Sequence, residues 1–524
     1  MAHSVLRFAL LAAAASAAPP PPPAAFRLAK VFSDSMVLQR DTTAASVWGF
    51  APANAVVQPT LNRVALPAVA ADSTGSWAVR LPPQPAGGPH ELSFSSGGAQ
   101  LNLTDVLFGD VVLCGGQSNA VFAVPGLINA SAEVALAGDP AFRSIRVMTV
   151  GDLPKEAKPL SDLRSVLQPW APANSSTIAR GGAFGEFSAF CWLAGRGVFD
   201  GLNRTVPLGL IASASSGTPI EAWMSDAMLA RCPQSPNDPY KGQNAGLWNG
   251  QIAPFASPES NRSMALSSII WWQGEANAAF NQTDYYACAF PVLVEHWRAA
   301  FGGAARNAIA FGFVHLQAFY KYSVPQHNDT ASVAWFREAQ LAALALPNVT
   351  AATAIDLGDP LSPAGSIHIR DKQAAGARLA AGLLALRHGV ADAPYVSPRA
   401  TGTSCSAVPG GGLKAVVSLD AAAVAAAGGL RLLEGPSCPT SLGVNITLCS
   451  WFGLLGSDGL WRNATATLAP GGGASVTLTA AARAGVTPAA SGYAWSIYPV
   501  ATLATRHGPG GWPLPVLPWL QTCD

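Results

Sequence analysis

Val111-Val112-Leu113-Cys114-Gly115-Gly116-Gln117-Ser118-Asn119 is the stretch of sequence that decides the fold. Its first four residues form an apolar run typical of a buried strand, and the two glycines permit a sharp turn after it. Residues that follow the C-terminal end of a strand in an open α/β sheet lie where ligands bind. The stretch therefore predicts the first strand of an α/β domain and a candidate nucleophile, Ser118. The alternative is a glycine-rich loop in which Ser118 only caps the following helix.

The residues that follow alternate between short apolar runs and helical patterns. Because strands that alternate with helices form parallel sheets, we predict a mainly parallel α/β domain over residues 108–395. The expected strands are 145–148, 207–212, 267–272, 309–316 and 349–355, and the expected helices are 284–301, 331–346 and 371–387.

Both flanks of this domain have the pattern of β structure. Residues 26–107 contain short alternating runs such as 76–81, which predicts a small β domain. Residues 396–524 contain further strand-like runs between glycine-rich turns, and they predict a second β domain. Its expected strands are 413–419, 429–433, 474–478 and 493–498. The fold class is thus α/β, with sandwich-like β domains at both ends.

The N-terminus has the pattern of an export signal. Residues 1–18 contain a weakly basic start, an apolar run and the small-x-small sequence Ala15-Ser16-Ala17. Residues 19–25 form a proline-rich linker. The alternative is a disordered Ala/Pro-rich tail. Export predicts a secreted, lysosomal or vacuolar glycoprotein.

The cysteines and the glycosylation sequences agree with export. The chain has eight cysteines, without the C-x-x-C spacing of metal or redox sites, and four of them lie in its last quarter, which suggests disulfides there. Their connectivity cannot be read from sequence. Ten N-x-S/T sequences occur. They begin at Asn102, Asn129, Asn174, Asn203, Asn261, Asn281, Asn328, Asn348, Asn445 and Asn463.

The composition and the apolar runs argue against two classes of protein, nucleic-acid-binding proteins and proteins with a membrane-spanning helix. Of the 524 residues, 12% are charged and the net charge is +1, so the chain offers no basic face for nucleic acid. Half of the residues are hydrophobic, but no uninterrupted apolar run reaches the roughly 18 residues that span a membrane.

Three other loops at the same expected sheet edge carry candidate site residues. His368, in Gly365-Ser366-Ile367-His368, follows the last expected strand and is a candidate general base, or else an exposed loop histidine. The loop 271–277 contains the carboxylate of Glu275 and the side-chain amides of Gln273 and Asn277; the amides could stabilise an oxyanion or serve only the turn. The loop 215–223 could add the backbone N–H of Ser216 or Gly217, or be an ordinary turn.

Together these loops resemble the sialate O-acetylesterase family of the SGNH/GDSL hydrolases. Six segments carry the resemblance, and they span nearly all of the chain after the leader. They are Met36-Val37-Leu38-Gln39, Gly116-Gln117-Ser118-Asn119, Gly217-Thr218-Pro219-Ile220-Glu221-Ala222-Trp223, Trp272-Gln273-Gly274-Glu275 with Asn277, Ser366-Ile367-His368 with Asp371-Lys372-Gln373, and Tyr493-Ala494-Trp495.

The resemblance implies a carboxylic ester hydrolase that releases acetate from O-acetylated sialic acids through an acetyl-enzyme. It implies Ser118 as nucleophile and His368 as general base. Ser118 N–H, the Ser216/Gly217 backbone and an amide of Gln273 or Asn277 would form the oxyanion hole. It implies no metal or organic cofactor, and an O-acetylated carbohydrate as the partner.

The chain departs from the family pattern at the third catalytic residue. Gly365 stands where an aspartate three residues before the histidine is usual in SGNH hydrolases. His368 could instead be oriented by a backbone carbonyl, by Glu275, or by Asp356 or Asp359. Two other functions stay open at this point: a polysaccharide acetyl esterase, and a catalytically inactive glycan-binding glycoprotein.

Overall fold

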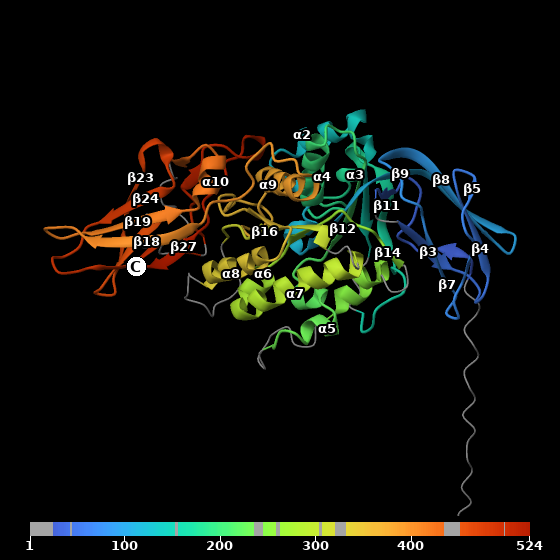
Figure 1. Cartoon of the computed structure of the whole chain (residues 1–524), viewed down its shortest axis with the longest axis horizontal. Helices are drawn as coiled ribbons and strands as arrows, with labels where there is room; N and C mark the ends of the chain where they lie inside the picture. Colours follow the sequence, from blue (N-terminus) through green and yellow to red (C-terminus); the bar gives the residue numbers. More distant parts are fainter. Residues whose placement is uncertain are drawn as a thin grey trace, which may run out of the picture.

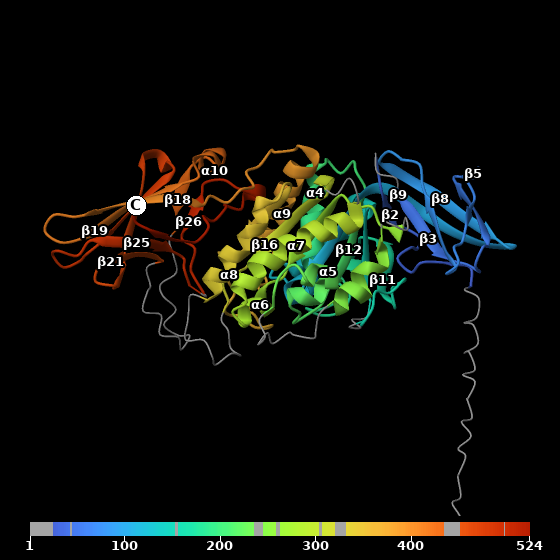
Figure 2. The same cartoon turned by 60° about the horizontal axis from the view of Figure 1, so that its bottom comes forward.

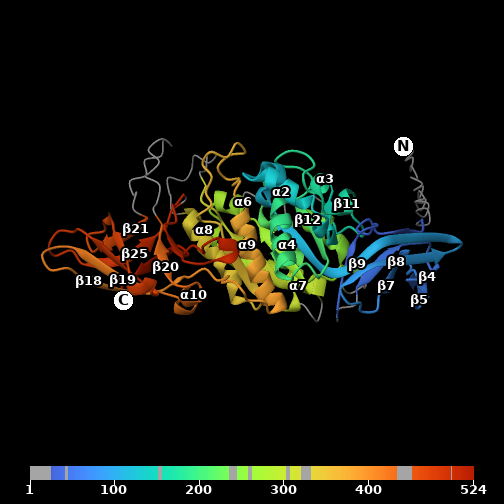
Figure 3. The ribbon, with the colours of Figure 1, turned by 90° about the horizontal axis from the view of Figure 1, so that it is seen from above.

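The computed structural model describes residues 25–41, 45–151, 156–234, 245–257, 262–302, 307–319, 332–433, 451–496 and 498–524. Three β-rich or mixed parts follow one another along the longest axis, with the helices gathered in the middle (Figures 1 and 3). The expected signal peptide and nearly all of the proline-rich linker lie outside the described residues. So do Cys438, Cys449 and three of the N-x-S/T asparagines, Asn261, Asn328 and Asn445.

The N-terminal part is all β, as its alternating runs predict. One small sheet has the order β1 (Arg27–Leu28), β3 (Ser46–Phe50), β7 (Ser76–Arg80). Next to it, β4 (Val56–Leu61) pairs with β8 (Gly87–Ser96), and β8 pairs with β9 (Ala99–Gly116). Strand β9 continues without a break into the central sheet, so the boundary predicted after residue 107 falls inside this one strand.

The central sheet is mainly parallel, which confirms the predicted fold class. Its strand order is β11-β10-β12-β9-β15-β16-β17. Every neighbouring pair on this path is parallel except β10 and β11. The strands are β10 (Ile145–Val150), β11 (Val166–Pro172), β12 (Leu208–Ala214), β15 (Ser268–Trp272), β16 (Ala310–His315) and β17 (Val349–Thr353). Parallel pairing places the C-terminal ends of all of these strands except β11 at one edge, together with that of β9.

Helices cover both faces of this sheet. In Figure 1, α4 (Ala189–Gly201) and α9 (Gln373–Leu383) lie on one side, and α5 (Asp226–Leu229) and α7 (Thr283–Gly302) on the other. Helix α8 (Ser332–Gln340) packs beside α7 (Figure 2). Helices α4 and α9 approach closely because they meet at glycines: a Cβ at Gly376 would lie 2.7 Å from Leu193 Cβ.

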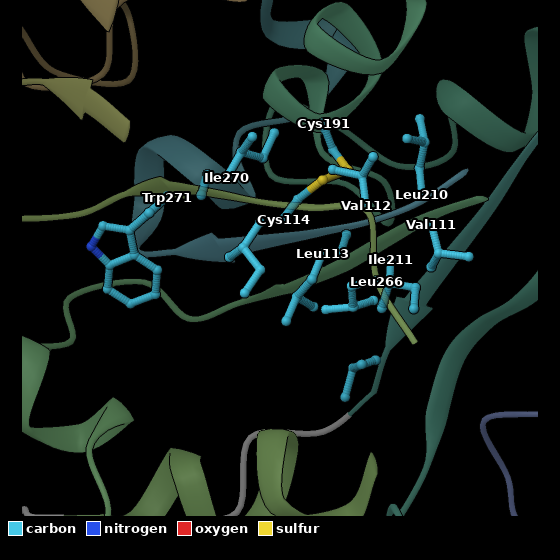
Figure 4. Close-up of a cluster of buried hydrophobic side chains, with 14 of the residues drawn as sticks. Val111, Val112, Leu113, Cys114, Cys191, Leu210, Ile211, Leu266, Ile270 and Trp271 are labelled. Carbon is cyan, nitrogen blue, oxygen red and sulfur yellow. A yellow bond between two sulfur atoms is a disulfide. The ribbon is translucent and has the colours of Figure 1, made fainter. Parts of the chain in front are cut away.

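Three disulfides join described cysteines. Cys114 of β9 is bonded to Cys191 of α4 in the middle of the buried core, as Figure 4 shows. Cys232–Cys288 joins α7 to the segment after α5. Cys405–Cys523 lies in the last quarter and confirms the expectation of disulfides there.

The C-terminal part has a hydrophobic core of its own, whereas the N-terminal and central parts share one core. It contains a four-stranded sheet of β18 (Ala400–Ala407), β19 (Leu413–Leu419), β24 (Ser475–Ala480) and β23 (Thr465–Leu468). A second sheet consists of β22 (Trp461–Asn463), β21 (Phe452–Gly456), β25 (Pro488–Tyr493) and β27 (Trp519–Thr522). Among the described helices, none is both long and apolar enough to cross a membrane.

One predicted strand of this part is wrong. We expected a strand over 493–498, but β25 ends at Tyr493. Ala494 adopts a φ of +52°, and this left-handed conformation interrupts the extended backbone.

Candidate active site

Four loops that are far apart in sequence meet at the C-terminal edge of the central sheet. They follow β9, β12, β15 and β17, as the sequence predicts. Hydrogen bonds join them to one another: Ser215 N to Gly116 O (3.0 Å), Gln117 N to Trp272 O (2.9 Å), and Asn119 Nδ2 to Ile367 O (2.8 Å). The residue next to Ser118 is thus bonded to the residue next to His368.

Ser118 is the first residue of the short helix α1 (Ser118–Val121), directly after β9. Gln117 occupies the cap position, and no side chain makes a capping hydrogen bond there. The structure therefore gives Ser118 no capping role. The residue is 7% exposed, so its hydroxyl lies at a nearly buried position.

The turn before Ser118 requires glycine at position 116. Gly116 has a φ of +139°, and a Cβ there would lie 2.1 Å from Trp272 O. We expect Gly116→Ala to lower the free energy of unfolding by about 3 kcal/mol or more. The backbone strain of alanine at this φ and the clash of its Cβ with Trp272 O both destabilise the folded state. Since the turn carries Ser118, esterase turnover should fall as well. Urea unfolding and an acetyl ester assay measure the two effects.

Gly97 provides the matched control for this substitution. It has a φ of +56° in the β8–β9 turn, and a Cβ there would meet nothing within 4 Å. Gly97→Ala should therefore cost only about 1 kcal/mol and leave turnover intact. If both substitutions lowered the free energy of unfolding equally, the clash with Trp272 O could not be the cause of the larger effect expected at Gly116.

His368 is half-buried between two aromatic rings. The centroid of the Phe184 ring lies 5.1 Å from that of His368, edge to face, and the Phe122 ring is stacked at 6.5 Å. His368 Nδ1 lies 2.6 Å from Ala364 O. Because a carbonyl only accepts, Nδ1 carries the proton and Nε2 is left as the basic nitrogen. Burial lowers the pKa of His368 below its ordinary value.

The contact to Ala364 bears on the alternatives for orienting His368. Asp356 is paired with Arg378 at 2.7 Å, and Asp359 with Arg370 at 2.6 Å. Both carboxylates thus point to arginines. Of the groups considered from sequence, the one that directly contacts the imidazole is a backbone carbonyl.

The two predicted amide donors are buried and already hydrogen bonded. Gln273 Nε2 lies within 3.2 Å of Gln117 Oε1, Thr218 O and Asn277 Oδ1. Asn277 Nδ2 donates to Glu221 Oε2 (2.9 Å) and Gln282 Oε1 (2.8 Å). These amides hold the loops together in the present arrangement.

Unlike the two side-chain amides, the predicted backbone donors are not engaged in hydrogen bonds with described residues. Within the described part of the chain, the N–H groups of Ser118, Ser216 and Gly217 donate to no protein acceptor. Ser216 and Gly217 are exposed, and Gly217 adopts a φ of +69°. A ligand that accepted from these N–H groups would therefore displace no hydrogen bond within the described part of the chain.

Comparison with known proteins agrees with this arrangement. The family model described as carbohydrate esterase, sialic acid-specific acetylesterase, matches residues 171–384. Sialate O-acetylesterase of Homo sapiens is 36% identical over 398 residues, which cover 71% of this chain and 73% of the human protein. The chain belongs to the sialate O-acetylesterase family.

Two further relatives extend the comparison. Sialate O-acetylesterase of Rattus norvegicus is 33% identical over 423 residues, covering 71% of this chain and 76% of the rat protein. The crystal structure of a carbohydrate acetylesterase from Xanthomonas citri superposes with a TM-score of 0.75 at 28% identity, over 94% of this chain and 99% of that one. These matches show that the chain is a carboxylic ester hydrolase.

Two buried side chains at this edge received no role from sequence. Gln317 lies two residues after β16, and its Nε2 donates to Ile367 O at 2.9 Å. Lys372 Nζ donates to Asn119 Oδ1 at 2.6 Å. Both side chains are 0% exposed. The position of Gln317 just after a central strand was the one signal that could have identified it.

Proposed function

We propose that this chain is a serine esterase that releases acetate from O-acetylated sialic acids, with Ser118 as nucleophile and His368 as general base. One observation carries the proposal: the loop of His368, whose Nδ1 is held by Ala364 O, is bonded to the nucleophile loop through Asn119.

The proposed reaction uses these two side chains in the following steps. His368 Nε2 takes the Ser118 hydroxyl proton while Oγ attacks the acetyl carbonyl, and the C–O bond to the sugar breaks. The imidazolium gives its proton to the leaving sugar oxygen. Water, deprotonated by His368, then attacks the acetyl-enzyme, acetate leaves, and Ser118 regains its proton.

The oxyanion hole belongs to the same proposal. The free N–H groups of Ser118, Ser216 and Gly217 are its first candidates because nothing in the protein has to be released to use them. Gln273 or Asn277 would have to give up a present hydrogen bond to take part.

The pH dependence of turnover tests the role of His368. Burial lowers its pKa, so the neutral imidazole that acts as base persists to lower pH than usual. We expect the acid limb of kcat/KM to lie below pH 6.5, the ordinary histidine pKa. A pH profile with p-nitrophenyl acetate measures it, and an acid limb at or above that pH would contradict the assignment.

The substrate is tested by acetate release. The proposal expects higher kcat/KM for 9-O-acetyl sialic acid than for acetylated xylan. Polysaccharide acetyl esters are the second candidate, because the Xanthomonas citri structure, described as a carbohydrate acetylesterase, covers nearly the whole chain. The reverse preference would favour that candidate.

We also propose that the chain is exported. Three disulfides between described cysteines are typical of oxidising compartments, and the sequence of residues 1–18 supports an export signal. Expression of the full chain in eukaryotic cells should place the cleaved glycoprotein in the medium or in lysosome-like compartments. Uncleaved protein in the cytosol would contradict export.

A further inference from the structure

A buried arginine joins the C-terminal part of the chain to the edge of the sheet that carries the candidate site. Arg337 lies on α8 and is 1% exposed. Its guanidinium donates to three main-chain oxygens: Nε to Leu316 O (3.0 Å), Nη2 to Gln317 O (2.7 Å) and Nη1 to Ser496 O (2.7 Å). Leu316 and Gln317 directly follow β16, whereas Ser496 lies three residues after β25. One side chain thus fixes both segments.

Helix α8 contacts both segments with further side chains. It lies at the end of the central part nearest to the C-terminal part (Figures 1 and 2). Gln340, three residues after Arg337, accepts from Leu316 N at 3.0 Å, so two side chains of one helix hold the same residue. Trp335 of the same helix meets Trp495 edge to face, with the ring centroids 4.9 Å apart. The position of the loop after β16 therefore depends on α8 and on its contacts with the C-terminal part.

The loop after β16 matters for the proposed reaction because Gln317 reaches the loop of His368. Gln317 Nε2 donates to Ile367 O at 2.9 Å, and Ile367 is the residue before His368. Arg337 holds the main-chain oxygen of the same glutamine. Because the Gln317 side chain is 0% exposed and closely packed, a shift of its backbone would move the amide away from Ile367 O. Arg337 is therefore two hydrogen bonds away from the backbone beside the histidine.

A buried arginine is costly at this place unless the direction of its N–H groups is used. Burial lowers the pKa of Arg337 to about 9, because a cation is disfavoured away from water. An apolar side chain of similar volume can often replace a buried charge without loss of stability. The guanidinium adds a planar fork whose N–H groups point in fixed directions. It therefore sets the main-chain oxygens of Leu316, Gln317 and Ser496 in one geometry.

We propose that the C-terminal part of the chain positions His368, with Arg337 as the positioning residue. Arg337 joins Ser496 O to the backbone of Gln317, whose amide holds the residue before the histidine. The inference rests on the proposed function, since it presupposes that His368 is the base. A small misplacement of a reacting group lowers the rate strongly. Because this role needs no contact with the substrate, its loss should affect kcat rather than KM.

The first experiment replaces Arg337 by lysine, which keeps the charge but cannot donate to the three oxygens together. Arg337→Lys should lower kcat for p-nitrophenyl acetate about tenfold or more and change KM less than about twofold. The value of kcat is expressed per folded molecule, measured by circular dichroism below the melting transition. A merely structural arginine would change the melting temperature alone. An unchanged kcat would overturn the proposal, even if the melting temperature falls.

A second variant tests the same link from the C-terminal part. Trp495→Leu removes the ring contact with Trp335, next to the Ser496 oxygen. It should lower kcat about threefold with an unchanged KM, because the hydrogen bond from Arg337 is loosened and not lost. In the Arg337→Lys background the same substitution should not lower kcat further, since the link is already broken. Equal factors in both backgrounds would mean that the two residues act independently, which would overturn the proposal.

Arg298→Lys is the matched control. Arg298 is 2% exposed and donates to the main-chain oxygens of Pro347 and Asn348, which precede β17 at the end of the sheet opposite the site. Its replacement should lower the melting temperature and leave kcat unchanged. A similar loss of kcat in both arginine variants would overturn the proposal. Turnover of the parent protein separates this inference from the proposed function. An active parent with a fully active Arg337→Lys variant overturns the inference alone, and an inactive parent overturns both.

Discussion

Ser118→Ala is expected to lower kcat/KM for an acetyl ester roughly 10⁴-fold or more, with an unchanged melting temperature. The activity falls because no other hydroxyl can form the acetyl-enzyme at this position. Stability is kept because Gln117, not Ser118, occupies the cap of α1, and the Ser118 side chain makes no capping bond. Hydrolysis of p-nitrophenyl acetate and thermal unfolding measure the two results.

Ser225 is the matched control for this substitution. Its hydroxyl caps α5 by accepting from Met228 N at 3.3 Å. Ser225→Ala should lower the free energy of unfolding by about 1 kcal/mol and keep turnover. If Ser118→Ala behaved in the same way, Ser118 would be a structural serine. Absence of turnover in the unmodified protein would instead favour the inactive glycan-binding alternative.

The place where the candidate loops meet could be predicted from sequence because the strands of a parallel sheet all run in the same direction. Once strands alternate with helices, all their C-terminal ends lie at one edge, so loops carrying Ser118, Gly217, Gln273 and His368 must come together. No distance between them was needed for that step. The hydrogen bonds between these loops show that they do meet at this edge.

The parts that sequence missed lack a periodic or local signal. Helix α4 contains Gly195, Gly197 and Gly201, and because glycine has a low helix propensity, the sequence did not predict a helix there. Gln317 lies outside every sequence motif that carried the resemblance. The partner of His368 Nδ1 is a main-chain oxygen, whose position depends on loop conformation rather than on the identity of Ala364.

His368→Ala is expected to reduce kcat/KM by about the same factor as Ser118→Ala, roughly 10⁴-fold or more, because nucleophile and base act as one unit. For the same reason the double variant should be little worse than either single one. Steady-state kinetics of the three variants, with thermal unfolding as a check on folding, measures this non-additivity.

His296→Ala is the matched control, since His296 lies on α7 and, among the described residues, its Nδ1 is bonded to Val292 O of the same helix. It should retain full turnover. Additive losses for Ser118→Ala and His368→Ala would mean that the two residues act independently. His368 would then contribute through its contacts with Phe122 and Phe184, and the proton of Ser118 would need another acceptor. Losses that do not add would instead support the proposed proton transfer from Ser118 to His368, whose Nδ1 lies 2.6 Å from Ala364 O, so that Nε2 is left as the acceptor.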